Sequence, residues 1–141
     1  MTILARDPEL VRTTSNNRNA DLTTIVMGEA GEAGQAYRVD SSDNKGYLCD
    51  AGAGDVESAG FTGYLLGNAA MDERVQAQIN GEIFLGVAAI EGTFYFTSAT
   101  AGETEDCAAQ AQGNAGQLIG YGQADGSIKI KPVSSGGIIP T

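Results

Sequence analysis

The stretch RVQAQINGEIFLGVAAIEGTFYFT, residues 74–97, contains the strongest strand and turn signals in the chain. Val75, Ala77 and Ile79 alternate with polar residues and lead into Asn80-Gly81, a pair that readily adopts the two positive φ values of a type I′ turn. This pattern predicts a β-hairpin that returns through residues 82–85. Residues 93–97, TFYFT, predict a further strand because aromatic residues and threonine favour extended backbone.

Outward from this stretch, short apolar runs separated by turn residues continue in both directions. They predict strands at 22–27, 35–39, 46–49, 61–66, 117–121 and 127–131. Residues 40–45 and 124–126 are expected to be hairpin connections and residues 98–114 a surface loop. Residues 67–73 could form at most one helical turn, because their hydrophobic pattern is too short for a stable helix. Eight or nine closely spaced short strands predict an all-β fold, a single compact β-barrel or β-sandwich.

The composition agrees with this fold class. A chain of 141 residues is long enough for one domain with a real core. Twenty glycines against three prolines favour tight turns and short strands. With no tryptophan and few Phe and Tyr, the core must rest mainly on aliphatic side chains.

Charge and residue types argue against several functions. The formal net charge is −10, which disfavours nucleic acid and anionic membranes as partners. The chain has no histidine, so the usual Ser/His/Asp and Cys/His arrangements are absent. Lys45, Lys129 and Lys131 are predicted in a turn or on a solvent face, where a neutral lysine base is not expected. We therefore expect no enzymatic activity, no cofactor and no metal site.

The two cysteines, Cys49 and Cys107, are isolated and lack metal-ligand spacing. Two interpretations stay open, namely inert free thiols and a single disulfide. The N-terminus shows no continuous apolar run of a signal peptide, and no stretch approaches the length of a membrane span. A soluble protein made in the cytosol is expected.

Both ends of the chain differ from its middle. Residues 1–20 combine two apolar pairs with a polar, turn-prone run, so we expect an extended arm before a body at residues 21–132. The arm either orders on a neighbouring subunit or is a disordered terminus. Residues 133–141 are a Gly/Ser tail whose apolar pair Ile138-Ile139 either packs on the body or docks on a neighbour.

Four motifs occur in a fixed order along the chain: YRVDSSDNKGYL at 37–48, a glycine-bounded strand ending in NAA at 61–70, the stretch 75–103, and a closing LIGYG…IKIKP segment at 118–136. As an ordered set they resemble small bacteriophage capsid decoration (cement) proteins and head-fibre-associated proteins. The resemblance implies an all-β virion protein without catalytic residues, bound outside an icosahedral shell as a trimer or other small oligomer. No site residue is carried over.

The expected function is therefore a non-enzymatic structural virion protein, made in the host cytoplasm, that stabilises a capsid by bridging major capsid protein subunits. Its expected partners are the major capsid protein and other copies of itself, most simply in a homotrimer. A virion-surface binding module, either a head-fibre base or a carbohydrate-recognition domain, is the alternative; a small hydrolase or metal enzyme ranks last. The expected contact residues are Ile3, Leu4, Leu10, Val11, Arg12, Arg18, Ile138 and Ile139.

Overall fold

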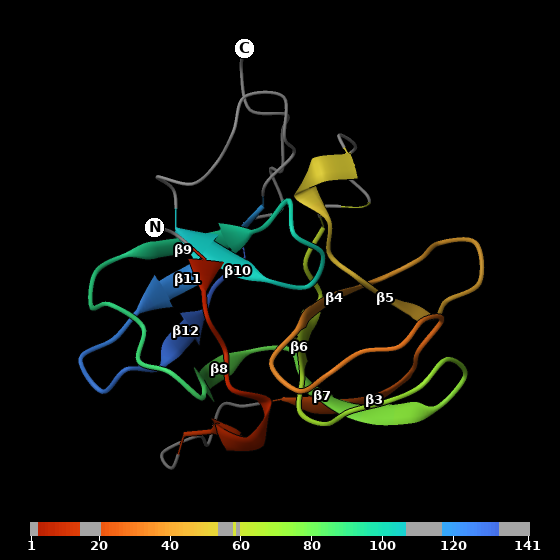
Figure 1. The fold of residues 1–141 in the computed structure, drawn as a ribbon, viewed down its shortest axis with the longest axis horizontal. Helices are drawn as coiled ribbons and strands as arrows, with labels where there is room; N and C mark the ends of the chain where they lie inside the picture. The colour runs from red at the N-terminus through yellow and green to blue at the C-terminus, as the bar shows by residue number, and fades with distance from the viewer. Residues whose placement is uncertain (1–2, 15–20, 54–57, 59, 107–116, 133–141) are drawn as a thin grey trace.

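The computed structural model describes residues 3–14, 21–53, 58, 60–106 and 117–132, which form two antiparallel β-sheets (Figure 1). The larger sheet has seven strands in the order β1-β10-β9-β11-β12-β8-β2. The smaller sheet has five strands in the order β3-β7-β6-β4-β5. The predicted all-β class is confirmed.

The bounds of the strands in the larger sheet are β1 Ile3–Leu4, β2 Val11–Thr13, β8 Gly81–Leu85, β9 Phe94–Thr97, β10 Thr104–Asp106, β11 Leu118–Gly122 and β12 Ile128–Ile130. Those in the smaller sheet are β3 Leu22–Val26, β4 Ala36–Val39, β5 Gly46–Leu48, β6 Gly63–Leu65 and β7 Arg74–Gln78. Two 3-10 turns complete the described elements, η1 Pro8–Leu10 and η2 Ala51–Ala53.

The larger sheet is strongly curved, as its connections require. Strands β1 and β2 lie at opposite edges of this sheet, yet only residues 5–10 join them. Such a link spans at most about 25 Å, whereas seven flat strands would hold their edges about 29 Å apart. The sheet therefore curls into a half-barrel whose two edges are joined by the N-terminal segment.

This arrangement corrects the predicted N-terminal arm. Ile3 and Leu4 pair with β10, and Val11 to Thr13 pair with β8, so residues 3–14 belong to the body. Leu4 and Val11 also pack against the core. Strands of two and three residues show no sequence period, and their partners lie about 100 and about 70 residues away, so local pattern could not reveal them. The predicted arm residues 1–2 and 15–20, and the predicted tail, lie outside the described residues.

The predicted hairpin at Asn80-Gly81 is wrong. Strands β7 and β8 follow one another directly but belong to different sheets. Gly81 has a positive φ of 83° and Asn80 does not, so the two-residue geometry of a type I′ turn is not formed. Instead the Asn80 side chain accepts a hydrogen bond from the Asp21 amide at 2.6 Å and donates one to the Asp21 carboxylate. These bonds fix a corner at which the chain passes from one sheet to the other.

The two remaining hairpins are confirmed. Strand β4 pairs with β5 across residues 40–45, and β11 pairs with β12 across a turn in which Gly126 has a φ of 86°. The predicted helical turn at 67–73 is wrong, because this segment forms bends, a bridge from Gly31 to Ala69 and a turn. Strand β10 lies inside the predicted loop 98–114, where the polar sequence Thr-Glu-Asp gave no strand signal. Residues 107–114 of that loop lie outside the described part.

Strand alternation builds the core. In β8, Ile83 and Leu85 are buried while Phe84 points to the other face. In β12, Ile128 and Ile130 are buried and Lys129 is half-buried, as the sequence predicted. The main core cluster contains Ala36, Cys49, Phe61, Tyr64, Ile83, Leu85, Ala89, Tyr95, Ile119, Ile128 and Ile130. A second cluster inside the smaller sheet contains Met27, Tyr37, Leu65, Ala69, Val75 and Ala77.

Candidate binding surface on the larger sheet

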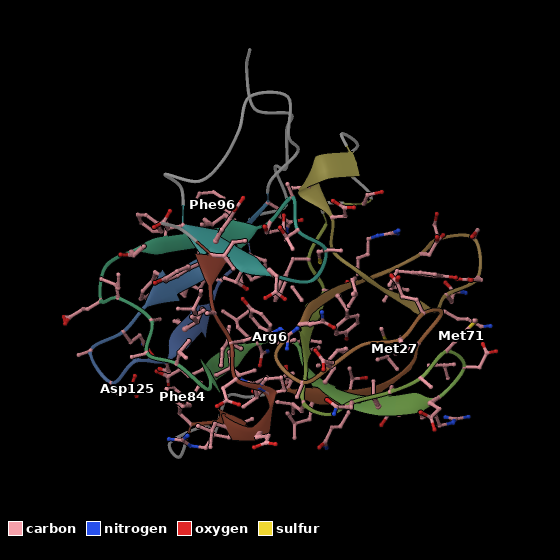
Figure 2. The ribbon with its side chains drawn as sticks, viewed as in Figure 1. Arg6, Met27, Met71, Phe84, Phe96 and Asp125 are labelled. Carbon is pink, nitrogen blue, oxygen red and sulfur yellow. The ribbon has the colours of Figure 1, made fainter. Side chains whose placement is uncertain are left out.

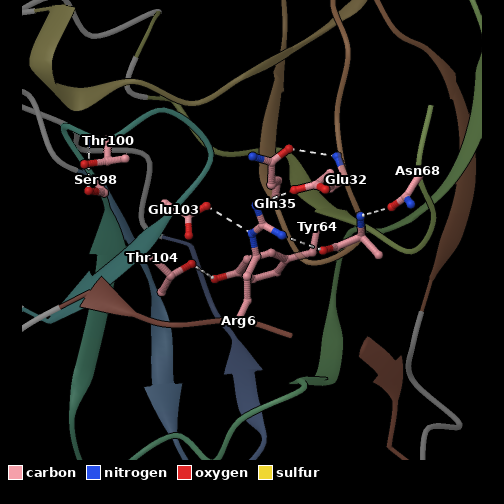
Figure 3. A network of polar contacts seen from close by, with 10 residues as sticks. Arg6, Glu32, Gln35, Tyr64, Asn68, Ser98, Thr100, Glu103 and Thr104 are labelled. Carbon is pink, nitrogen blue, oxygen red and sulfur yellow. Dashed lines mark hydrogen bonds and ion pairs between the residues drawn. The ribbon is translucent and has the colours of Figure 1, made fainter. Parts of the chain in front are cut away.

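An ion-pair network lies at the junction of the two sheets (Figure 3). Arg6, whose side chain is 11% exposed, donates from Nε to Glu103 at 3.0 Å and from Nη2 to Glu32 at 3.1 Å. It also donates to the carbonyl of Ala33 at 3.3 Å. Glu103 precedes β10 in the larger sheet, whereas Glu32 lies between β3 and β4 of the smaller sheet. Arg6 therefore fastens the N-terminal segment to both sheets and is not available to a partner.

Nucleophilic and acidic groups in the interior are held in unreactive states. Cys49 is buried and free, its thiol donates to the Gly60 carbonyl at 2.9 Å, and burial raises its pKa. Cys107 lies outside the described residues. The Tyr64 hydroxyl hydrogen bonds to Thr104 at 2.7 Å, and burial raises the pKa of Tyr64 as well. This interior is built for packing.

The acidic loop at 40–45 bonds to its own atoms. Asp40 accepts hydrogen bonds from the amide and the hydroxyl of Ser42, both at 2.8 Å, and these bonds lower the pKa of Asp40. Asp43 accepts from the Tyr47 hydroxyl at 2.6 Å and from the Lys45 amide at 3.0 Å, which lowers the pKa of Asp43. Within the described ranges, no three His, Cys, Asp or Glu side chains gather in a way that could hold a metal ion.

A β-bulge shapes the outer face of the larger sheet. Leu118 stands opposite Phe96 and Gly120 opposite Tyr95, with a register shift between them. Two residues of β11 thus face one residue of β9, and Ile119 and Tyr95 both point into the core. A Cβ at Gly120 would lie 1.8 Å from the backbone oxygen of Lys129, so this position requires glycine. The bulge keeps both Leu118 and Tyr121 on the outer face.

Aromatic side chains cluster on that outer face. Tyr121 stands directly between Phe94 and Lys129, and the next row places Leu118 beside Phe96. Phe94 is 53% exposed, and Phe84, Phe96 and Tyr121 are partly exposed. Figure 2 places Phe84 and Phe96 on the part of the molecule formed by the larger sheet, away from Met27 and Met71 of the smaller one. We call the set Phe84, Phe94, Phe96, Leu118, Tyr121, Arg12 and Lys129 the aromatic face.

The aromatic face also carries charged side chains. The Arg12 guanidinium lies 4.5 Å from the centroid of the Phe84 ring. Arg6, Arg38 and Lys45 form ion pairs elsewhere, whereas Arg12 and Lys129 form none with any described residue. Two carboxylates lie on the same outer face, Glu82 directly opposite Lys129 and Glu105 directly opposite Phe96, so the charges of this face are mixed. The face therefore combines aromatic side chains with charges of both signs, which suits an apolar partner surface with a polar rim.

The predicted contact residues are divided by the structure. Arg12 belongs to the aromatic face. Ile3 pairs with Glu105, which in turn pairs with Phe96, so these three residues lie in one row across the outer face of the sheet. Leu10 is 52% exposed on η1. Leu4 and Val11 pack inward, so they are not free to contact a partner. Arg18, Ile138 and Ile139 lie outside the described residues.

The aromatic residues of this face were missed by the sequence analysis. The run Phe94-Tyr95-Phe96 places aromatic side chains on both faces of one strand. Since only one face of that strand can cover the core, this run indicated an apolar outer face. Tyr95 is buried at 3% exposure, whereas Tyr121 on the neighbouring strand reaches the surface.

The chain is therefore an all-β protein of two sheets, and the aromatic face lies on the outer side of the larger sheet. No protein-family model, curated protein or solved structure matches this chain. Among the described residues, no helix is long and apolar enough to cross a membrane.

Proposed function

We propose that this chain is a non-enzymatic structural protein of a bacteriophage virion that binds the outer surface of an icosahedral capsid and bridges its major capsid subunits. The observation that carries the proposal is the aromatic face: one exposed and three partly exposed aromatic side chains on the outer side of one sheet, with the Arg12 guanidinium over the Phe84 ring. The ordered motifs that resemble decoration proteins supply the identity of the partner.

The aromatic face has the composition of a protein-binding surface. Contiguous exposed apolar patches on a folded protein mark interaction sites. Interface hot spots are enriched in aromatic residues and arginine, and Arg12 stacked on Phe84 supplies both in one contact. Because the side chains stand on hydrogen-bonded strands, little conformational entropy is lost when they are covered.

Capsid stabilisation then follows from mass action. A protein that binds the assembled shell better than free subunits stabilises the assembled state by its differential affinity. Repetition over many equivalent sites makes a modest affinity per site sufficient. Leu10, Arg18, Ile138 and Ile139 stay predicted contacts of the proposal, and a small homo-oligomer, with a trimer as the expected form, stays a prediction from the resemblance.

The proposal is tested by density-gradient separation of the native source material. We expect the chain to migrate with particles of virion size, at a fixed ratio to a major shell protein. Recovery only as a small free protein would contradict the proposal.

The second candidate is a carbohydrate-recognition or head-fibre module on the virion surface. The partly exposed Tyr121 beside the exposed Phe94 favours it, since flat aromatic faces also stack on sugar rings. A glycan array separates the two functions. Reproducible binding that is lost in Tyr121→Ala would favour the sugar reader, and an empty array would count against it.

A further inference from the structure

The last described strand, β12, ends beside the aromatic face. Lys131 follows β12, and its amide donates to the Ile119 carbonyl of β11 at 2.8 Å. Lys131 comes directly after the buried Ile130, so its side chain lies on the same outer side of the sheet as Lys129. Lys131 and Pro132 are both exposed. The chain therefore continues from the outer side of the larger sheet.

The nine residues after Pro132, VSSGGIIPT, are long enough to reach the centre of the aromatic face. Strands β12, β11 and β9 are neighbours (Figure 1), and Lys129 stands opposite Tyr121, which stands opposite Phe94. With about 3.4 Å per residue along a strand and about 4.8 Å between strands, Pro132 lies about 11 Å from Tyr121 and about 14 Å from Phe94. The chain from Pro132 to Ile138 spans up to about 20 Å. This connection can therefore bring Ile138 onto either ring of the same chain.

The tail also matches the chemistry of the aromatic face. Its residues 134–137 have small side chains, and Ile138-Ile139 is its only pair of adjacent large apolar residues. On the face, Phe94 is 53% exposed and Tyr121 is partly exposed, so both rings have surface left to bury. Because residues 133–141 contain no charged side chain, the mixed charges of the face neither attract nor repel them, and burial of apolar surface decides the contact.

The covalent connection favours this contact within one chain. A segment on a short linker meets its site at an effective concentration on the order of millimolar, which is roughly a thousand-fold above that of separate molecules at micromolar concentration. Two isoleucines have only a weak affinity for two aromatic rings, and an effective concentration of this size is enough to populate such a contact.

We propose that Ile138 and Ile139 pack on Phe94 and Tyr121 of their own chain, so that the tail and the aromatic face form one continuous apolar surface. Of the two places that the sequence leaves open for this pair, the body is therefore the one that it occupies. Each copy in a homotrimer carries the same surface. The packing does not depend on what the protein binds. Its consequence for the capsid rests on the proposed function: Ile138 and Ile139 contact the shell as part of the aromatic face and not at a separate site.

The packing is tested by NMR on the full chain with a nitroxide spin label at Thr141→Cys. The background is Cys107→Ser, and Cys49 is buried and escapes labelling. We expect the label to broaden the amide signals of Phe94 and Tyr121 more strongly than any others outside the tail and its connection to β12.

Two variants separate packing from mere proximity. In Ile138→Ser/Ile139→Ser the broadening at the aromatic face should fall about two-fold or more, since the label then samples every direction that a Gly/Ser linker allows. Val133→Ser, which removes an apolar side chain before the glycine pair, is the matched control and should leave the broadening unchanged. Equal broadening with and without the two isoleucines would overturn the proposal, and so would broadening that is strongest away from the aromatic face.

A mixed sample shows which chain supplies the tail. It combines isotope-labelled chains that lack the spin label with spin-labelled chains that lack the isotope. We expect only weak broadening of Phe94 and Tyr121 in this mixture. Broadening as strong as within one chain would assign the contact to a neighbouring copy and overturn the proposal.

Occupancy on shells tests the consequence for the capsid. Phe94→Ser/Tyr121→Ser and Ile138→Ser/Ile139→Ser should each lower occupancy about ten-fold, and the combined variant should lose far less than the roughly hundred-fold that independent sites would give. Losses that multiply would place the tail at a separate capsid site and overturn this consequence. If the wild type binds no shell, the proposed function fails, whereas the NMR measurement still decides whether the tail packs on the aromatic face.

Discussion

At the scale of single residues, Cys49 shows how burial removes reactivity. Its thiol is buried and donates a hydrogen bond to the Gly60 carbonyl, and burial raises its pKa. Little thiolate therefore forms at neutral pH. In a Cys107→Ser variant we expect no reaction with an aromatic disulfide reagent in native buffer and one thiol per chain after denaturation. Labelling of the native protein at the rate of a free cysteine would contradict this assignment.

Glu105 is a carboxylate that the fold destabilises. It is 5% exposed, and desolvation by burial raises its pKa above the ordinary value of 4.5, with Asp106 adding to the rise and a hydrogen bond from Ser98 opposing it. A raised carboxyl pKa means that the folded state binds the proton more tightly than the unfolded state does. Stability therefore falls as pH rises from about 4.5 through the folded pKa.

Glu105→Gln should consequently raise the midpoint of thermal unfolding at pH 7, and the gain should shrink toward pH 4. The change in stability should be on the order of 1 kcal/mol. The Glu91→Gln variant, which removes one negative charge from an exposed position, is the matched control for the loss of charge. The prediction would be contradicted if Glu105→Gln stabilised the protein less at pH 7 than at pH 4, with each variant compared with the wild type at the same pH.

At the scale of elements, the bulge of β11 depends on Gly120. Gly120→Ala would place a Cβ against the backbone oxygen of Lys129, so the β11–β12 ladder must separate. We expect a loss of about 3 kcal/mol in the free energy of unfolding, measured by urea titration. Gly67→Ala, whose Cβ would meet only Val75 at 3.5 Å, should change it by less than about 1 kcal/mol. Equal effects at both positions would show that the bulge is not constrained.

The elements also show how far local sequence determines structure. The β4–β5 and β11–β12 hairpins could be predicted because their turn residues and alternation lie within about 15 residues of sequence. The pair Asn80-Gly81 carried an equally strong local signal for a hairpin. The hairpin does not form, because the Asn80 side chain hydrogen bonds to Asp21 and β8 pairs with β12 and β2 instead of β7. The aromatic face was out of reach for the same reason, because it gathers side chains from five separate strands, β2, β8, β9, β11 and β12.

At the scale of the whole molecule, the N-terminal segment holds the half-barrel closed. Arg6→Met would leave Glu103, with a side chain 18% exposed, without its cation at the sheet junction. We expect the free energy of unfolding to fall by about 2 kcal/mol, since the pair is mostly but not fully buried. Lys131→Met, on an exposed cation that forms no ion pair with any described residue, is the control and should be close to neutral. A neutral effect of Arg6→Met would contradict the role of the network.

Removal of the segment should have a larger effect than loss of one ion pair. A chain lacking residues 1–14 loses β1, β2 and Arg6, and it exposes the edges of β10 and β8. We expect it to lose cooperative urea unfolding or to aggregate. If the truncated chain unfolded at the wild-type urea midpoint, residues 1–14 would be an arm separate from the folded body, as first predicted from the sequence.

The central claim is that the aromatic face attaches this protein to a capsid. The most direct measurement is the occupancy of variants on shells of the particle with which the chain migrates, quantified after co-sedimentation. We predict that Phe94→Ser combined with Tyr121→Ser lowers occupancy at least ten-fold, which corresponds to about 1.4 kcal/mol, while Val39→Ser on the smaller sheet leaves it unchanged. Full occupancy by a folded Phe94→Ser/Tyr121→Ser variant would contradict the claim.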